Sequence, residues 1–405
     1  MAAGLDARAA RGDFAGPLHG LPIAIKDLAE TAGIRTTYGS PIFADHVPSF
    51  DAPHVALLKR AGAVVIGKTN TPEFGAGSQT FNSVFGPTRN PYDTRLTPGG
   101  SSGGAAAAVA SGMIPFADGS DLAASVRNPA AFCGLVGLRT TPGLVPADPF
   151  DPLPVVGPIA RTAEDAALLL AGMCGPDSGR PLARSDRAGG FLDLRPASLR
   201  GLRVAWTFDL GDLPVQPEVR AVLGAARDRL EQAGCEVADH APALADADEV
   251  FQTLRAALMA GMAPLLRAHR DQIKATLAWN IEKGIALTGE QIAAARARHA
   301  AIFERVRSFL ADGRYDVLAL PTVQVVPFDV DTDWVREING EPMATYIDWM
   351  RSCSRITVSA HPAVSVPAGL TAARLPVGVQ LVGRYGADRR LLEIAAAIMA
   401  LAGPG

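Results

Sequence analysis

Two neighbouring serines, Ser101 and Ser102, lie in the glycine-rich run TPGGSSGGAAAAVASG. A serine hydroxyl attacks a carbonyl carbon only when a base removes its proton, and the G-x-S-x-G spacing around Ser102 is that of a hydrolase nucleophile elbow. An elbow needs a buried strand directly before it, whereas the preceding NPYDTRLTP is polar and proline-rich. A flexible linker is excluded as well, because apolar segments flank the run. The run therefore predicts a structured turn that opens a helix, where backbone N–H groups meet a ligand.

A phosphate-binding pattern is also present, in which Gly62 is followed after four residues by Gly67, Lys68 and Thr69. The four intervening residues, AVVI, favour a strand over a loop, and Pro72 interrupts the helix that should follow. We therefore predict a structural role for Lys68 and no phosphate loop.

The sequence around these motifs carries a family resemblance. The run that begins GKTNTPEFGAGSQ and continues through GGSSGGAAAA and GSDLAASVRNPAAFCG resembles the signature of the amidase signature family. Upstream, GPLHGLPIAIKDLAE is similar to the family's lysine-bearing segment, and downstream YDVLALPT, HPAVSVPAG and LPVGVQLVG are similar to its C-terminal strands. The resemblance covers nearly the whole chain and is weakest from about residue 180 to 310.

The resemblance implies a Ser-cis-Ser-Lys catalytic set. In this set Ser125 is the nucleophile, Ser101 is the bridging serine after a cis peptide bond, and Lys26 is the base. Lys26 directly follows the apolar run LPIAI, where burial would disfavour the charged form of its amine, as a base requires. Taken alone, a lysine at a strand end more often reaches solvent. Ser102 is implied as a supporting hydrogen-bond residue.

The resemblance also implies an oxyanion hole formed by the main-chain N–H groups of Leu122, Ala123, Ala124 and Ser125. The family has Gly-Gly before its nucleophile, where this chain has Ala123 and Ala124. Their methyl groups either restrict the backbone angles of the loop or narrow the space beside the scissile bond. Rate and substrate range are affected in both cases, but the reaction class is not.

Two further sets of residues are implied near the nucleophile. Asp121 and Arg127 flank it, and we expect them to form a buried structural ion pair or hydrogen bond. The family places part of its substrate channel at four small residues that leave room for a bulky acyl or aryl group: Gly75, Ala76, Gly77 and Ser78.

Composition excludes several classes of protein. The 405 residues are 48% hydrophobic and 20% charged, which predicts a folded globular protein. Basic and acidic side chains number 38 and 41 without a basic run, which argues against a nucleic-acid partner. The histidines and cysteines lack metal-ligand spacing, so we expect no metal or cofactor and four reduced, buried thiols. The absence of a secretory signal and of a long apolar run predicts a cytoplasmic protein outside the membrane.

Apolar periodicity predicts an α/β fold in one domain spanning residues 1–405. The strands are expected at residues 21–25, 63–66, 114–117, 201–208, 235–239, 316–322, 363–369 and 377–383. The helices are expected at residues 51–62, 105–113, 162–173, 219–233, 248–311 and beyond Asp388.

Strands at both ends of the chain predict a single sheet, and the resemblance implies a three-layer α/β/α arrangement with a central mixed sheet. The prolines between residues 140 and 160 predict a surface loop. The segment 180–312, largely helical, is expected to be more variable and to cover the substrate.

The sequence thus indicates an amidase that hydrolyses a carboxamide or carbamate (urethane) C–N bond, with ester hydrolysis as a related activity, through an acyl-serine intermediate. One alternative is the glutaminase (A-type) subunit of a tRNA amidotransferase, which needs partner subunits. Another, motivated by the two alanines, is a non-catalytic small-molecule binding protein. Only 25 residues precede Lys26, where the resemblance implies helices that help dimerisation. Either those helices are trimmed or the sequence is partial, and both a monomer and a homodimer remain open.

Overall fold

A mixed β-sheet forms the centre of the computed structural model, which describes residues 2–148, 150–184, 188–311 and 314–401. Its strands are Phe116–Asp121 (β5), Val155–Ala160 (β7), Val136–Arg139 (β6), Ala363–Leu370 (β13), Pro376–Val382 (β14), Val317–Pro321 (β10), Arg203–Trp206 (β8) and Glu236–Asp239 (β9). Within the described residues the order is β5-β7-β6-β13-β14-β10-β8-β9. Neighbours pair antiparallel from β5 to β10, whereas β10, β8 and β9 pair in parallel.

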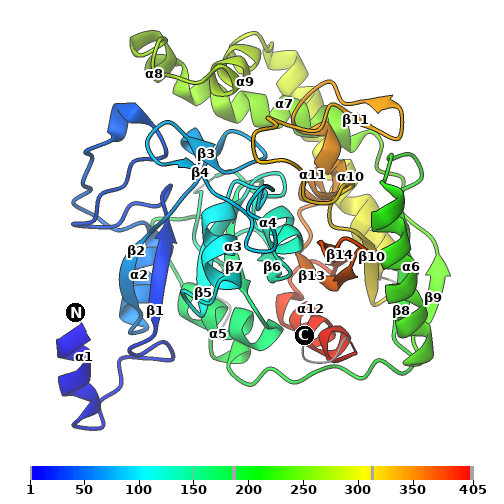
Figure 1. The fold of residues 1–405 in the computed structure, drawn as a ribbon, viewed down its shortest axis with the longest axis horizontal. Helices are drawn as coiled ribbons and strands as arrows, with labels where there is room; N and C mark the ends of the chain where they lie inside the picture. The colour runs from blue at the N-terminus through cyan, green and yellow to red at the C-terminus, as the bar shows by residue number, and fades with distance from the viewer. Residues whose placement is uncertain (1, 149, 185–187, 312–313, 402–405) are drawn as a thin grey trace.

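Helices cover both faces of this sheet (Figure 1). One face packs against Ala163–Met173 (α5), Pro217–Gln232 (α6) and Asp388–Ala400 (α12). The other packs against Gly103–Ala110 (α3), Arg127–Phe132 (α4), Ala247–Met259 (α7), Gly289–Ala311 (α10) and Arg351–Val358 (α11). In β10, Val317 and Ala319 face the first layer and Leu318 faces the second, because successive side chains point to opposite faces of a sheet. The predicted three-layer α/β/α fold is confirmed.

The remaining elements lie around these layers. They are Ala2–Ala9 (α1), Pro22–Lys26 (β1), Pro53–Arg60 (α2), Val64–Thr69 (β2), Phe81–Asn82 (β3), Gly86–Pro87 (β4), Ala263–Ala268 (α8), Ala275–Ile285 (α9), Glu337–Ile338 (β11) and Glu341–Pro342 (β12). Among the described helices, none has both the length and the apolar character that crossing a membrane requires.

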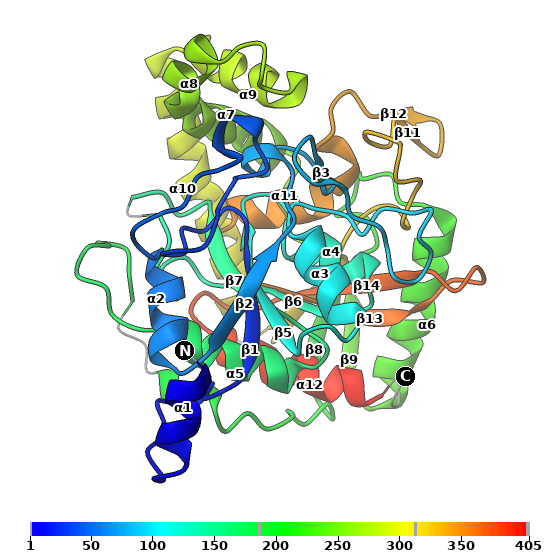
Figure 2. The same ribbon diagram turned by 60° about the vertical axis from the view of Figure 1, so that its left-hand side comes forward.

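The strands near the N-terminus do not join the main sheet. β1 and β2 form their own parallel pair, which lies beside β5 (Figure 2). The N–H of Lys26 donates to the Asp118 carboxylate of β5 at 2.8 Å instead of to a main-chain carbonyl, so the ladder of backbone hydrogen bonds does not continue. The prediction of a single sheet is therefore wrong for these two strands.

The prediction of a surface loop over residues 140–160 is wrong for its last part, which forms β7 with all six of its residues buried. Three of those six residues are β-branched and favour a strand. The prediction gave more weight to the number of prolines and was wrong for that reason. β6 pairs only with Ile159 and Ala160, so Pro158 lies before the part of β7 that has partners on both sides. Pro149 lies outside the described residues.

The helical prediction for residues 248–311 holds, and the segment is divided into α7, α8, α9 and α10. A capping box begins α10: Gln291 N–H donates to Thr288 Oγ1 at 3.2 Å, and Thr288 N–H donates to the Gln291 side chain at 2.8 Å. Residues 185–187 and 312 of the variable segment 180–312 lie outside the described residues.

The phosphate-loop pattern is a strand, because β2 runs through Gly67, Lys68 and Thr69. The Lys68 ammonium donates to the hydroxyls of Thr31 and Thr36 at 2.9 and 3.0 Å and thereby holds the loop after β1. The structural role predicted for Lys68 is confirmed.

The glycine run opens α3 two residues earlier than predicted and lets this helix approach other main-chain segments closely. A Cβ on Gly104 would clash with the main chain of Asn70, directly after β2, and a Cβ on Gly100 would lie 2.7 Å from the Gln79 carbonyl carbon. The glycines therefore serve close approach and not flexibility.

We expect Gly104→Ala to lower the free energy of unfolding by about 1–3 kcal/mol, because the added methyl must displace the Asn70 main chain. Gly224→Ala is the matched control: Gly224 also lies in a helix, α6, but a Cβ there meets no atom within 4 Å. Alanine should stabilise that helix by up to about 1 kcal/mol. Urea unfolding measures the stability of both variants. Equal changes in the free energy of unfolding would contradict the close approach of Gly104 to the Asn70 main chain.

Candidate active site

The amine of Lys26 lies at the centre of a cluster of hydroxyl groups. Lys26 is the last residue of β1 and is only 1% exposed. Its Nζ lies 2.8 Å from the Oγ atoms of both Ser101 and Ser102 and 3.0 Å from that of Ser120. The alternative of a strand-end lysine that reaches solvent is therefore wrong.

Burial lowers the pKa of Lys26 to about 7, although the carboxylates of Asp118 and Asp121 act in the opposite direction. The neutral amine is therefore well populated near neutral pH. A charged amine donates three hydrogen bonds, whereas a neutral amine donates two and accepts one. Three hydroxyl neighbours satisfy both states, so the amine can take a proton from a hydroxyl without a large movement of heavy atoms.

Main-chain geometry holds the two neighbouring serines against this amine. The peptide bond between Gly100 and Ser101 is cis. The Asn128 side chain donates to the Gly100 carbonyl at 3.2 Å, which fixes the turn from the side of α4. Ser102 N–H donates to the Ser125 carbonyl at 3.1 Å and ties this turn to the loop that follows β5.

Ser125 lies on the loop between β5 and α4 and is half-buried. Its main chain is joined to Ser102, but within the described residues its hydroxyl makes no hydrogen bond with the amine or the other serines. The structure thus brings Lys26, Ser101 and Ser102 into one hydrogen-bonded cluster and places Ser125 beside that cluster.

The main-chain N–H groups of residues 122–125 lie on the loop that ends at Ser125, the predicted nucleophile. In the part of the chain that the structure describes, none of the N–H groups of residues 122–125 donates to a protein acceptor. The N–H groups of Ala124 and Ser125 share their peptide bonds with the carbonyls of Ala123 and Ala124. Both carbonyls accept hydrogen bonds within the protein: Ala123 from the Arg127 side chain at 2.9 Å and Ala124 from the Asn128 N–H at 2.7 Å. Because C=O and N–H point in opposite directions in a trans peptide, the N–H groups of Ala124 and Ser125 point away from these partners. They are available to a ligand oxygen.

The two alanines before Ser125 fit this loop. Neither Ala123 nor Ala124 has a positive φ, so the conformation does not demand glycine. Ala124 is fully buried, and both alanines belong to the apolar cluster that includes Phe132 and Leu153. Restriction of the loop backbone therefore fits the structure, whereas the buried Ala124 methyl does not narrow an open substrate space.

Asp121 and Arg127 form a fully buried ion pair with nitrogen–oxygen distances of 2.9 and 3.0 Å. Burial alone would raise the pKa of the Asp121 carboxyl, but the guanidinium groups of Arg127 and Arg139 lower it to about 2. Arg127 also donates to Thr357 of α11 at 2.9 Å and to Gln380 of β14 at 2.6 Å. This guanidinium therefore anchors the loop of residues 122–125 to the sheet and to α11.

The predicted substrate-channel segment Gly75–Ser78 borders the serine cluster. A Cβ on Gly75 would lie 3.7 Å from Ser101 Oγ, and a Cβ on Gly77 would lie 3.1 Å from the Nζ of Lys274. This segment therefore connects the surroundings of the cluster with the start of α9.

Three residues at the cluster were missed by the sequence reasoning. Ser120 contacts the amine directly, Asp118 holds the Lys26 N–H, and His54 Nε2 lies 3.1 Å from the second oxygen of the Asp118 carboxylate. Asp118 and Ser120 are two residues apart in β5 and therefore share one face of the strand. The polar residues at alternate positions of FADGSD could have indicated that Asp118 and Ser120 lie at the site. No feature of the sequence linked His54 of α2 to these two residues.

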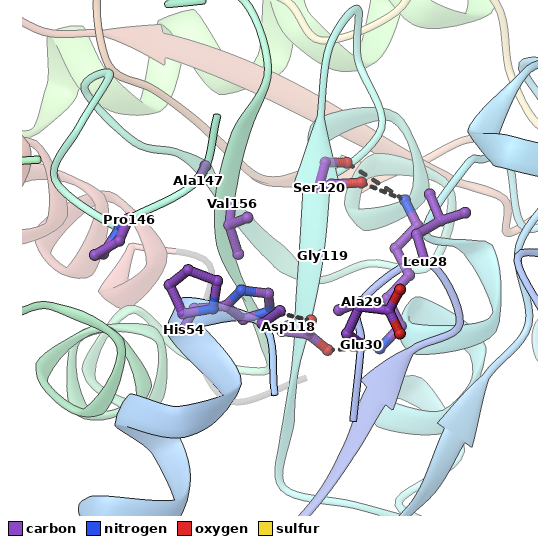
Figure 3. Close-up of a pocket in the computed structure, with 13 residues that line it drawn as sticks. Leu28, Ala29, Glu30, His54, Asp118, Gly119, Ser120, Pro146, Ala147 and Val156 are labelled. Carbon is purple, nitrogen blue, oxygen red and sulfur yellow. Dashed lines mark hydrogen bonds and ion pairs between the residues drawn. The ribbon is translucent and has the colours of Figure 1, made fainter. Parts of the chain in front are cut away.

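A cavity of about 200 Å³ borders these residues. Figure 3 shows His54 and Asp118 directed toward each other at this cavity, with Ser120 farther along the same strand and Glu30 on the opposite wall. The volume is below the roughly 300–1,000 Å³ typical of small-molecule sites. The cavity is therefore smaller than a typical site for a small-molecule ligand.

All four cysteines are buried. Among the described residues, no group of three or more His, Cys, Asp or Glu side chains is arranged to hold a metal ion.

Comparisons with known proteins show the family and fold to which this chain is similar. A family model described as Amidase matches residues 1–392. The chain is 36% identical to an acylamidase from Rhodococcus erythropolis, over 98% of this chain and 84% of that protein. It is 33% identical to the A-type subunit of a glutamyl-tRNA(Gln) amidotransferase from Alkaliphilus metalliredigens, over 97% of this chain and 85% of that protein. The crystal structure of a bacterial aryl acylamidase of the amidase signature family superposes with a TM-score of 0.90 and 29% identity, over 98% of this chain and 86% of that one.

Between pH 7 and 9 we expect the stability of the wild-type protein to rise relative to that of a Lys26→Met variant. Lys26 becomes neutral in the folded protein above a pKa of about 7, but its ordinary value is 10.5, so the unfolded chain binds the extra proton and rising pH favours folding. One pKa unit corresponds to about 1.4 kcal/mol, and we expect a gain of about 2 kcal/mol over this range.

Urea unfolding at several pH values measures this difference. Lys283→Met, which removes an exposed lysine from α9, controls for the general loss of one positive charge. A difference between wild type and Lys26→Met that stays constant from pH 7 to 9 would contradict a neutral buried amine.

Proposed function

We propose that this chain, which belongs to the amidase signature family of amide-hydrolysing enzymes, cleaves C–N bonds of linear amides through an acyl-serine intermediate. In this mechanism Ser125 is the nucleophile, Ser101 is the proton relay and Lys26 is the base. The observation that carries the proposal is the buried Lys26 amine, 2.8 Å from the Ser101 hydroxyl and with a pKa lowered to about 7 by burial. A base that is neutral near physiological pH can accept the proton that a serine must lose before it attacks.

The first half of the reaction forms the acyl-serine. Ser125 Oγ attacks the amide carbon, its proton passes to Ser101 Oγ, and the Ser101 proton passes to the neutral Lys26 amine. The carbonyl oxygen becomes an oxyanion and accepts hydrogen bonds from the free N–H groups of residues 122–125, which lower its energy. The C–N bond then breaks while a proton returns from Lys26 through Ser101 to the leaving nitrogen.

The second half releases the acid. A water molecule gives a proton to the same relay and attacks the ester carbon, and the C–O bond to Ser125 breaks as the proton returns to its oxygen. The enzyme is then ready for another cycle, and no cofactor takes part in these steps.

The same steps apply to carbamates (urethanes) and to esters, because each offers a carbonyl carbon, an oxyanion and a leaving group that takes a proton. We include both activities in the proposal, together with a small-molecule substrate, a cytoplasmic location and the absence of a nucleic-acid partner. The helical segment 180–312 is proposed to cover the substrate.

A glutaminase subunit of a tRNA amidotransferase is the second candidate, favoured by the similarity to the A-type subunit of such an enzyme. Release of ammonia from glutamine without turnover of aryl amides would support it.

A non-catalytic binding protein is the third candidate, and covalent labelling tests it. A fluorophosphonate should label the wild-type protein and leave Ser125→Ala unlabelled. A wild-type protein that is neither labelled nor active would support the binding role.

We expect Ser125→Ala and Lys26→Ala to lower kcat for an anilide by about 10⁴-fold or more, because nucleophile and base act as one unit. A panel of anilide, primary amide, ester and carbamate substrates measures the rates. With wild-type enzyme, kcat/KM should rise with pH up to about pH 7, as Lys26 loses its proton, and then level off. Undiminished rates in Lys26→Ala would refute its assignment as the base.

We expect Ala124→Gly to lower kcat by about fivefold for small and bulky amides alike. Glycine adds about 1 kcal/mol of backbone freedom to the loop that carries the proposed oxyanion donors. The Ala124 methyl is fully buried, so its loss should not open space for larger substrates. Rates for acetanilide and for a long-chain acyl anilide test this, and a selective gain for the bulky substrate would show that the methyl does limit the space.

A further inference from the structure

A cavity of about 500 Å³ lies between α9 and the base of the β11–β12 hairpin, and we name it the α9 groove. Trp279 and Lys283 of α9 line one side, and Trp334, Arg336 and Tyr346 line the other. Both walls lie at the same end of the molecule (Figures 1 and 2). Its volume is in the roughly 300–1,000 Å³ range of small-molecule sites, unlike that of the cavity beside Lys26.

Two connections join the α9 groove to the serine cluster. Lys274, the residue before α9, has its amine against Gly77 of the proposed substrate channel. The Gln79 side chain donates to the carbonyls of Thr332 and Asp333 at the rim of the groove. The main chain of the same Gln79 packs against Gly100, directly before Ser101. These contacts place the groove beside the segments that carry the proposed substrate channel and the serine cluster.

The walls of the groove are aromatic. Trp279 and Trp334 are half-buried and Tyr346 is buried, so flat apolar surfaces border an open space. Within the described residues, the buried Nε1 of Trp334 has no hydrogen-bond partner. Flat apolar walls suit an aromatic ring.

Two exposed cations stand at these walls. The Lys283 amine lies 4.7 Å from the centre of the Trp279 ring, and the Arg336 guanidinium lies 3.2 Å from the centre of a ring of Trp334. Asp333 is the acidic residue that lines the groove beside them. The lining therefore has an excess of positive charge.

A third cation lies behind the aromatic wall. Arg255 is 2% exposed, and its guanidinium lies 5.7 Å from the ring centres of both Trp279 and Tyr346. Its side-chain partners are neutral: Asn280, Tyr346 and Gln252. In the described part of the chain no carboxylate lies within ion-pair distance of it. A buried charge without a counter-ion raises the positive potential around it, and an anion nearby would compensate it.

We propose that the α9 groove binds the part of the substrate remote from the scissile bond, and that this part is an aromatic ring bearing a carboxylate or similar anionic group. The ring lies between the tryptophans, and the anion faces Lys283 and Arg336 at the open side. This inference rests on the proposed amidase function and adds the substrate class to it.

Binding to the Ser125→Ala variant tests the proposal without turnover. Two matched pairs place the ring on either side of the amide: 4-acetamidobenzoate with 4-methylacetanilide, and 4-carbamoylbenzoate with 4-methylbenzamide. In the pair that places the ring on the correct side of the amide, we expect the carboxylate to bind about tenfold more tightly than its methyl partner. The reason is that the carboxylate gains charge-assisted hydrogen bonds, which the methyl group cannot form. Calorimetry measures the affinities, and quenching of tryptophan fluorescence reports occupancy of the groove.

The preference for the carboxylate should disappear when Lys283→Met and Arg336→Met are combined with Ser125→Ala, and it should weaken at high salt. Arg389→Met is the matched control, since it removes an exposed arginine from α12 on the opposite layer. In the active enzyme the double variant should raise KM for the preferred carboxylate about tenfold, with kcat and the KM of the methyl partner nearly unchanged.

Equal affinities within both pairs, or a preference that survives in the double variant, would overturn the inference. That outcome differs from failure of the proposed function, in which wild-type enzyme would hydrolyse no amide or Ser125→Ala would retain activity. Binding and hydrolysis are measured on separate proteins, so the two failures are distinguishable.

Discussion

The Lys26 amine is removed from water, and three serine hydroxyls meet its hydrogen-bonding directions. An amine buried among apolar atoms alone would be strongly unfavourable in its charged form, so these hydroxyls make its burial tolerable. The serines come from two segments that are far apart from β1 in the sequence: the turn before α3 and strand β5. All three segments must therefore be held in register, and Asp118, which binds the Lys26 N–H, joins β1 to β5 through a side chain.

The same constraint extends to the loop that carries Ser125. The turn before α3 is tied to this loop by the hydrogen bond from Ser102 to the Ser125 carbonyl, and Arg127 holds the loop from the other side. Because the carbonyls of Ala123 and Ala124 are bound inside the protein, the N–H groups of Ala124 and Ser125 are left free. The Arg127 guanidinium thus fixes the peptide between Ala123 and Ala124, and the Asn128 N–H fixes the peptide between Ala124 and Ser125. Arg127 therefore has a structural role beside the proposed nucleophile.

Local patterns in the sequence predicted most of the elements, including β1, which ends at Lys26, and its partner strand β2. They failed where tertiary contacts decide. The β7 strand forms despite Pro158 because neighbouring strands bury its β-branched residues, and β1 leaves the main sheet because a carboxylate replaces a main-chain acceptor. His54 and Asp118 escaped notice because they are 64 residues apart and match no motif. The family resemblance assigned the roles of relay and nucleophile to Ser101 and Ser125. The G-x-S-x-G spacing alone would have indicated Ser102 as the nucleophile.

The separation of the two cavities has a consequence for how substrate preference can change. The proposed chemistry rests on residues 26 to 127, on β1, β5 and the start of α3 and α4, which hydrogen bonds join to one another. The α9 groove is built from residues 275 to 346, and its cations Lys283 and Arg336 are exposed side chains that no buried contact requires. On the proposed role of the groove, substitutions at these positions change recognition of the remote group, and they lie far in sequence from the buried amine. On the proposed roles, substrate preference can therefore change through the groove while the serine cluster stays the same.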